Sequence, residues 1–150
     1  MSAAAEVHQL LIFSDMYKKS PAKAWRQYKS RYTLTGTVCG KCGKKDFPAA
    51  QFCRFCHSPE QTACLFAPLA KLITWSTLQV APEGYEAFLP YTVAIIELEK
   101  GVRITTQLSG VNPGELKPGL RLKPVFRKIY EDGEEGVIHY GLKFTKFQST

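Results

Sequence analysis

Four of the five cysteines occur in two close pairs, and these pairs are the part of the chain best suited to chemistry. Each pair has the form Cys-x-x-Cys, with Cys39 and Cys42 in the first, Cys53 and Cys56 in the second, and ten residues between the pairs. A tight turn within each pair brings two thiolates to the same side, and four thiolates in a tetrahedron suit zinc best, with iron as the competing metal. Because the protein fills all four positions, the sequence predicts one structural zinc per chain.

The rest of the sequence offers no recognisable catalytic motif. The fifth cysteine, Cys64, lies in a short apolar stretch and is expected to be a small buried residue rather than a nucleophile. No Ser/His/Asp set, no paired carboxylates in a common motif and no glycine-rich phosphate loop can be identified in the sequence. We therefore expect a protein that is not catalytic by itself.

The N-terminal residues and the apolar runs predict where the protein works. Residues 1–6 lack the basic start, the apolar stretch and the cleavage site of a secretory signal, so we expect a cytoplasmic protein without disulfides. The longest apolar run, residues 63–67, is far shorter than the roughly eighteen residues that a membrane span needs. Membrane partners are therefore not expected.

Positive charge is concentrated toward the N-terminus. Of the formal net charge of +7, +6 lies in residues 1–61, whereas residues 62–150 hold ten Lys/Arg and nine Asp/Glu. Clustered cations favour a polyanionic partner, which could be nucleic acid, a phosphorylated cofactor or an acidic protein face. Charge alone does not choose among these three partners.

Residues 1–36 are predicted to form an N-terminal helical arm. Ser20 and Pro21 form a helix start, because serine caps a helix and proline fits its first position. Trp25, Tyr28 and Tyr32 then recur at helical spacing, with Lys and Arg on the other faces. The pattern indicates a basic, aromatic helix whose rings either pack on the body of the protein or face a partner.

The remaining chain is predicted to form a zinc ribbon and a β-barrel. Residues 37–61 contain almost no aliphatic side chains, so the four-cysteine site must organise them. In residues 62–150 the apolar residues recur with a period of two, and about five strands are expected. Five short strands separated by turns favour a small closed barrel of the OB type. The predicted fold class is mainly β: a helical arm, a four-cysteine ribbon and a five-stranded OB-type barrel.

Alternation also predicts which side chains share a face in the last two strands. Leu120, Leu122 and Phe126 alternate with cations in the first of them. In the final strand the alternating apolar residues are Ile138, Tyr140, Leu142 and Phe144. Each set is expected on one face of its strand, because successive side chains of a strand point to opposite sides.

The order of these parts resembles the DUF35 family, whose members join a rubredoxin-like zinc ribbon to an OB-fold. The resemblance covers roughly residues 20–148 and also rests on the sequence PYTVAIIEL at residues 90–98, on GVRI at 101–104 and on KPGLRL at 117–122. The family often has an arginine shortly after the Phe-Pro of its ribbon. This chain has Phe47-Pro48-Ala49-Ala50 instead, which leaves the anion contact of that arginine without a counterpart at this position.

The resemblance implies a non-catalytic accessory subunit of a thiolase-like or ketoacyl-synthase-like enzyme complex. Such a subunit docks on the catalytic dimer and helps to hold or shield the CoA thioester, so a thiolase-superfamily partner and acyl-CoA as a shared ligand are expected. Cations and aromatic rings together suit the phosphates and the adenine of CoA. The candidate CoA- or partner-binding residues are Trp25, Tyr28, Arg31, Lys44, Lys45, Arg54, Phe55, Tyr85 and Phe88.

Two other functions are weighed against this one. Single-stranded nucleic-acid binding is common among OB barrels and zinc ribbons, and Arg121, Lys123 and Arg127 share one face of a predicted strand. However, residues 62–150 carry a net charge of only +1, which is weak for an electrostatic nucleic-acid site. Electron transfer through iron in the four-cysteine site leaves the barrel without a role. Both functions rank below the accessory subunit.

Overall fold

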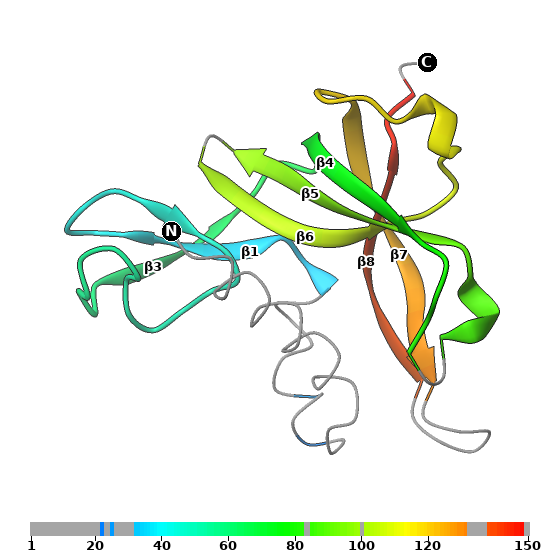
Figure 1. Ribbon diagram of the computed structural model, residues 1–150. Coiled ribbons are helices and arrows are strands. Elements are labelled where there is room, and N and C mark those ends of the chain that lie inside the picture. Colours follow the sequence, from blue (N-terminus) through cyan, green and yellow to red (C-terminus); the bar gives the residue numbers. More distant parts are fainter. Residues whose placement is uncertain are drawn as a thin grey trace.

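Two β-structures, a three-stranded sheet and a closed five-stranded barrel, follow each other along the chain (Figure 1). The computed structural model describes Ala22, Trp25 and residues 32–82, 85–99, 101–131 and 138–148. The mainly β fold class with an OB-like barrel is therefore confirmed. Most of the predicted helical arm, including Tyr28 and Arg31, lies outside the described residues. In the described part of the chain, no helix is long and apolar enough to span a membrane.

The small sheet has the strand order β2-β1-β3 and forms the ribbon. Its strands are β1 (Thr35–Cys39), β2 (Lys45–Asp46) and β3 (Gln61–Leu65), all antiparallel. The sheet therefore extends at both ends beyond the residues 37–61 predicted for the ribbon.

Gly36 in β1 allows the ribbon to pack closely against the start of the barrel. A Cβ atom at Gly36 would lie 2.1 Å from the carbonyl oxygen of Asp46 and 2.6 Å from the ring of Phe66. Such separations are below any real contact, so only glycine fits this position. Phe66, which follows β3, also donates its backbone N–H to the carbonyl of Leu34 at 2.9 Å. The ribbon and the barrel are thus connected through both of the strand ends at residues 34–36 and 65–66.

The barrel closes in the order β4-β5-β6-β8-β7. Its strands are β4 (Ala70–Leu78), β5 (Tyr91–Glu99), β6 (Val102–Leu108), β7 (Arg121–Glu131) and β8 (Ile138–Lys146). Two short 3-10 helices lie in its connections, η1 (Glu86–Phe88) before β5 and η2 (Pro113–Glu115) before β7. Closure depends on short pairings: β4 meets β7 at Ala70 and Lys71, and β6 runs parallel to β8 at Leu108.

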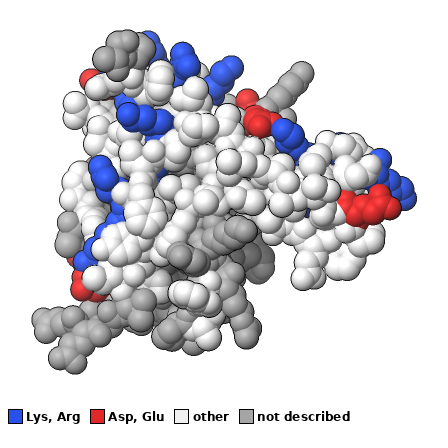
Figure 2. All heavy atoms as spheres, turned by 180° about the vertical axis from the view of Figure 1, so that it is seen from behind, with Lys and Arg blue, Asp and Glu red and all other residues white. Residues whose placement is uncertain are grey.

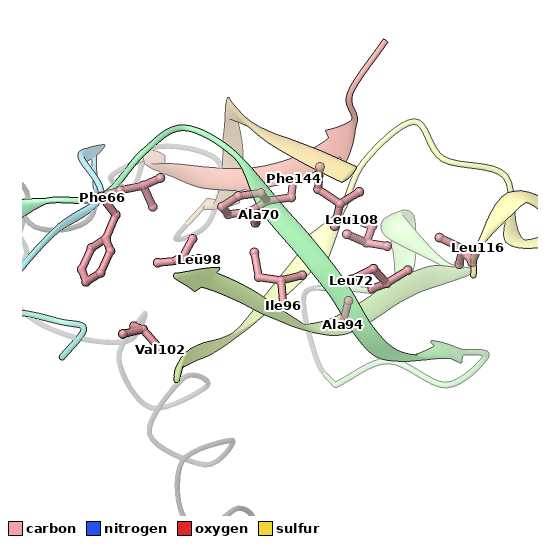
Figure 3. Packing of buried hydrophobic residues seen from close by; sticks show 12 residues of the cluster. Phe66, Ala70, Leu72, Ala94, Ile96, Leu98, Val102, Leu108, Leu116 and Phe144 are labelled. Carbon is pink, nitrogen blue, oxygen red and sulfur yellow. The ribbon is translucent and has the colours of Figure 1, made fainter. Parts of the chain in front are cut away.

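A single hydrophobic cluster fills the barrel and continues toward the ribbon (Figure 3). Leu72, Ile96 and Leu122 are fully buried at its centre. In β6, Val102, Thr106 and Leu108 are buried and alternate with less buried neighbours, which is the period-two pattern expected from the sequence. Phe66 and Val102 lie at one end of the cluster and Leu116 lies at the other (Figure 3).

The apolar face predicted for β7 and β8 is not buried in the outer part of the β7–β8 hairpin. Leu122 and Phe144 are buried as expected, but Phe126, Ile138 and Tyr140 are between 41% and 47% exposed. The reason is that β7 and β8 pair mainly with each other beyond the short closures at Leu122 and Phe144, and their register shifts between Lys128 and Tyr130. This part of the hairpin leaves the barrel, so its apolar face meets solvent and its own aromatic neighbours.

Candidate metal centre and ribbon surface

The two Cys-x-x-Cys segments fold into the same turn. In the first, the N–H of Cys39 donates to the carbonyl of Lys44 at 3.0 Å and the N–H of Gly43 donates to the carbonyl of Cys39 at 2.8 Å. In the second, the N–H of Cys53 donates to Ser58 at 3.0 Å and the N–H of His57 donates to Cys53 at 2.9 Å. Each turn therefore presents its two thiols in the same way, and the two turns face each other.

The residue after each second cysteine has a left-handed backbone. Gly43 has φ 68° and His57 has φ 57°. Glycine adopts this conformation without strain, whereas a residue with a Cβ atom does so at a cost. The first turn thus has the residue that this backbone favours, whereas nothing in the sequence marks His57 for the equivalent position, because histidine is not a typical residue for this backbone.

The four thiols converge to a cluster of the size that a tetrahedral metal requires. The sulfur atoms of Cys39, Cys42, Cys53 and Cys56 all lie within 4.8 Å of one another, with 3.5 Å between Cys39 and Cys56 and 3.6 Å between Cys42 and Cys53. Zinc–sulfur bonds of about 2.3 Å in a tetrahedron place the sulfurs about 3.8 Å apart. The cluster therefore fits one zinc ion, as the spacing predicts, with no position left for a substrate.

The pKa values of Cys39 and Cys56 indicate that the four thiols do not all ionise unless a cation is bound. Donation from the backbone N–H of Cys42 lowers the pKa of Cys39 to about 6, against the opposing effect of burial. The N–H of Ser58 also lowers the pKa of Cys56, but burial and the three neighbouring thiols outweigh it and raise this pKa to about 12. Four adjacent thiolates repel one another, so only a bound cation allows all of them to ionise.

Two of the four ribbon cations are engaged in ion pairs. Lys45 donates to Glu99 at the end of β5 at 2.7 Å, an ion pair that connects the ribbon to the barrel. Arg54 pairs with Asp46 and also reaches the carbonyl of Phe47 at 3.4 Å. Much of the predicted positive charge of the ribbon is thus neutralised within the chain. Figure 2 shows cations next to acidic side chains at the ribbon end, whereas Lys and Arg gather more widely over the barrel.

An exposed aromatic surface lies beside the second turn, and we call Lys44, Phe52, Arg54 and Phe55 the ribbon face. Phe52 is 60% exposed and Phe55 is 48% exposed. The Lys44 ammonium lies 4.4 Å from the centre of the Phe55 ring, and the Arg54 guanidinium lies 5.9 Å from it. Three predicted partner-binding residues are therefore brought together, and the exposed Phe52 directly precedes Cys53 of the same turn.

The other candidate residues lie apart from the ribbon face. Tyr85 and Phe88 contact each other, with ring centres 5.8 Å apart, in the connection that contains η1. This connection is on the side of the barrel away from the ribbon (Figure 1). Trp25 is 73% exposed, and Tyr28 and Arg31 lie outside the described residues. The predicted residues therefore occupy at least two separate surfaces. Cys64, in β3, is half-buried and packs against the core.

Sequence reasoning missed the aromatic cluster on the β7–β8 hairpin. The Phe126 and Tyr140 rings stack with centres 5.4 Å apart, and Tyr32 meets Phe126 edge-on at 4.9 Å. Periodicity places Phe126 on the same face as Leu122 but does not show that this face is exposed at Phe126. One available signal is that Arg127 and Lys128 follow Phe126 directly, because two successive cations of a strand point to opposite faces and both are usually exposed.

Comparison with known proteins identifies relatives over most of the chain. The model of the ChsH2 C-terminal OB-fold domain matches residues 66–127. A DUF35 domain-containing scaffold protein of Methanocaldococcus jannaschii is 39% identical over 132 residues, which cover 87% of this chain and 94% of the relative. A protein of the same description from Pyrococcus furiosus is 38% identical over 125 residues, covering 82% of this chain and 90% of the relative.

Solved structures share the fold at lower identity. The structure described as an Ltp2-ChsH2(DUF35) aldolase includes a chain with TM-score 0.59 and 21% identity, covering 83% of this chain and 89% of that one. A DUF35-family protein of unknown function from Sulfolobus solfataricus aligns with TM-score 0.56 and 16% identity, over 98% of this chain and all of that one. At these identities the likeness concerns the fold alone.

Proposed function

This chain belongs to the DUF35 family, and from that premise we propose that it is the scaffold subunit of a thiolase-like acyl-CoA enzyme complex in the cytoplasm. In this role it does not catalyse the reaction. It docks on the catalytic subunit through the ribbon face and helps to hold the CoA thioester. The observation that carries the proposal is an exposed pair of aromatic rings, Phe52 and Phe55, on a ribbon that a metal ion would make rigid.

The relatives and the composition of the site support a role without catalysis. The relatives that match more than four fifths of the chain are described as scaffold proteins, and one similar structure is described as an aldolase that contains a DUF35 chain. Within the described residues, the group of metal-binding side chains that comes together is the closed four-cysteine cluster. A closed cluster leaves no coordination position for a substrate, so its role is to organise the ribbon.

The ribbon face has the composition of a protein-binding surface. Exposed aromatic rings at the centre of an interface commonly contribute most of its binding energy, and cations at their edge tune the rate of association. Phe52 and Phe55 supply the rings, and Lys44 lies directly over one of them. Arg54 is held by Asp46, so we assign it to positioning rather than to direct pairing with a partner.

Contact with the CoA thioester is the finer part of the proposal. Of the three ribbon cations among the candidate residues, Lys44 is best suited to a phosphate, because Lys45 and Arg54 already pair with Glu99 and Asp46. The Phe55 ring beneath Lys44 offers a surface on which an adenine can stack. The connection that contains Tyr85 and Phe88 lies on the side of the barrel away from the ribbon, so we remove these two residues from the CoA-binding set (Figure 1).

Reconstitution with purified thiolase-superfamily proteins from the same organism tests the proposal. We expect a stable complex with one of them and acyl-CoA turnover that requires both chains. The Phe52→Ser/Phe55→Ser double variant should weaken the complex by at least about tenfold, since buried aromatic anchors are commonly worth more than 1.4 kcal/mol. Val80→Ser, at an exposed apolar residue after β4, is the matched control and should leave the affinity unchanged.

The outcomes separate the parts of the proposal. A wild-type chain that binds none of these proteins contradicts the thiolase-like partner, and equal losses in the two variants contradict docking through the ribbon face. Loss of CoA from the complex in Lys44→Glu, but not in Lys123→Glu, supports the CoA contact. Turnover by the single chain that disappears in Cys64→Ala would contradict the non-catalytic role.

A further inference from the structure

A pocket opens on the barrel surface between β5, β6 and β8, away from the ribbon. Its volume is about 300 Å³, and its walls come from four strands, from η1 and from the connection after β6. Phe88, Pro90, Val111 and Pro113 are among its apolar lining residues. Hydroxyl and amide groups of Thr77, Gln107 and Ser109 supply polar atoms, and Lys143 supplies a charge. The volume is at the lower end of the range for small-molecule sites.

Lys143 is the charged group of the pocket, and it lacks an acidic partner in the described residues. None of the ion pairs formed by those residues includes Lys143. Its ammonium lies instead 5.3 Å from the centre of the Phe88 ring. Burial lowers the pKa of Lys143, and the positive charge of Arg127 lowers it further. A half-buried cation without an anion is unfavourable, and an anion bound beside it would remove that cost.

The other described lysines of the barrel are either exposed or held in an ion pair. Lys71, Lys117 and Lys123 are exposed to water. Lys146, three residues along β8, pairs with Glu115 at 2.9 Å, and Lys128 in β7 pairs with Glu131. Both have an acidic partner within the chain, whereas Lys143 faces a ring, hydroxyl groups and a second cation. The charge at Lys143 is therefore not explained by packing of the barrel.

The remaining walls restrict the kind of anion. One side is apolar and aromatic, so a fully hydrated inorganic ion would leave Phe88, Pro90 and Val111 without contacts. The hydroxyl groups of Thr77 and Thr92 are 3.1 Å apart and share one hydrogen bond, so each keeps capacity for a further partner. A small organic molecule with one carboxylate satisfies both sides, because its charged end can meet Lys143 while its body covers the apolar wall.

We propose that this pocket binds a small organic carboxylate, held by an ion pair with Lys143 and by apolar contact with Phe88 and its neighbours. The site is on the opposite side of the barrel from the ribbon face, so the proposal does not depend on the scaffold role. Ser109 and Gln107 belong to the same lining, and we assign their hydroxyl and amide groups as donors to the second carboxylate oxygen.

Titration of the zinc-loaded protein with benzoate, followed by ¹H–¹⁵N NMR, tests the proposal. We expect saturable shifts confined to the pocket, at residues such as Gln107, Ser109 and Gly110, with a Kd of roughly 1 mM or lower. Lys143→Met keeps most of the length of the side chain but removes the charge, and it should weaken binding at least about tenfold. Lys146→Met, which removes a cation outside the pocket, should leave binding unchanged.

Two further probes distinguish an organic carboxylate from a neutral aromatic ligand and from an inorganic anion. Benzyl alcohol has nearly the same shape as benzoate without the charge and should bind at least about tenfold more weakly. Inorganic phosphate has the charge without the apolar body and should also bind more weakly. Equal binding of benzyl alcohol, equal binding of phosphate, unchanged benzoate binding by Lys143→Met with a native spectrum, or no saturable shift at all would each overturn the proposal.

Discussion

The ribbon and the barrel are both small β-structures, yet they are stabilised by different means. Among the residues of the ribbon, those with buried side chains are Thr37, Cys39, Cys53 and Ser58, all small or polar or both. The barrel instead buries aliphatic and aromatic residues such as Leu72, Ile96 and Phe144. Burial of apolar surface can hold the barrel together, whereas the ribbon has too little apolar surface and needs a bond to a metal. We therefore expect the ribbon to be stable only with a bound metal ion and the barrel to be stable without one.

Removal of the metal should give the largest difference in stability between the ribbon and the barrel. Cys53→Ser, or chelation of zinc from the wild type, is expected to unfold the ribbon, because about 10 kcal/mol or more of folding free energy comes from metal binding in such sites. The barrel is expected to stay folded, since its core lies in β4 to β8. Amide hydrogen exchange measures this directly: protection should be lost at Val38 and Thr62 and retained at Ile96 and Leu122.

Metal analysis accompanies this experiment. We expect close to one zinc per chain in the wild type and loss of zinc in Cys53→Ser, while Cys64→Ser, which changes the fifth cysteine outside the cluster, should retain it. A protein that contains neither zinc nor iron and keeps a protected ribbon would contradict the assignment.

A cavity in the barrel core should destabilise the barrel and leave the ribbon unchanged. Leu72 is fully buried, so Leu72→Ala is expected to reduce the free energy of unfolding of the barrel by about 2–5 kcal/mol. Zinc content should remain unchanged, because the ribbon does not use this side chain. Urea denaturation of the zinc-loaded protein gives the first quantity and metal analysis gives the second. Equal loss of zinc would show that ribbon and barrel fold as one unit.

Zinc affinity should depend on pH with a defined sign. Without metal, the pKa of Cys56 is about 12, so its thiol keeps a proton at neutral pH that zinc must displace. Affinity should therefore rise about tenfold for each pH unit and each proton released. Below about pH 6 the thiol of Cys39 is protonated as well, and the dependence should become steeper. Competition with a chelator of known affinity at several pH values measures it, and an affinity independent of pH would contradict this account.

The smallest expected effect compares the two turns of the metal site with each other. Gly43→Ala introduces a Cβ atom at φ 68° and should destabilise the zinc-loaded ribbon by about 1 kcal/mol. His57→Gly removes a Cβ atom at φ 57° and should not destabilise it, since glycine adopts this backbone freely. Chelator concentration at half-loss of zinc reports both changes. Destabilisation by His57→Gly as large as that by Gly43→Ala would show that the histidine side chain makes a contribution of its own.

The convergence of the four cysteines could be predicted from the sequence almost completely, because its geometry is local. The two residues between the cysteines of each pair determine the turn. Because only ten residues separate the pairs, the two turns must lie close to each other in the fold. The central strands were predictable for the same reason. In β6, Val102, Thr106 and Leu108 are buried whereas Arg103 is exposed, and the sequence itself shows this alternation.

Exposure, ion pairing and the pocket could be found only in the tertiary structure, because they depend on contacts between segments that are distant in the sequence. Phe126 and Tyr140 carry the same alternation as Leu122 and Phe144, and only the short closures of β7 with β4 and of β8 with β6 determine which of them are buried. The pairing of Lys45 with Glu99 and of Arg54 with Asp46 neutralises charge that a count along the chain treats as free. Likewise, the pocket at Lys143 is built by residues from Thr77 to Lys143 that no local pattern connects. Spacing along the chain determines a site whose ligands are close in sequence, whereas exposure and charge pairing are set by strands that meet only after the barrel has closed.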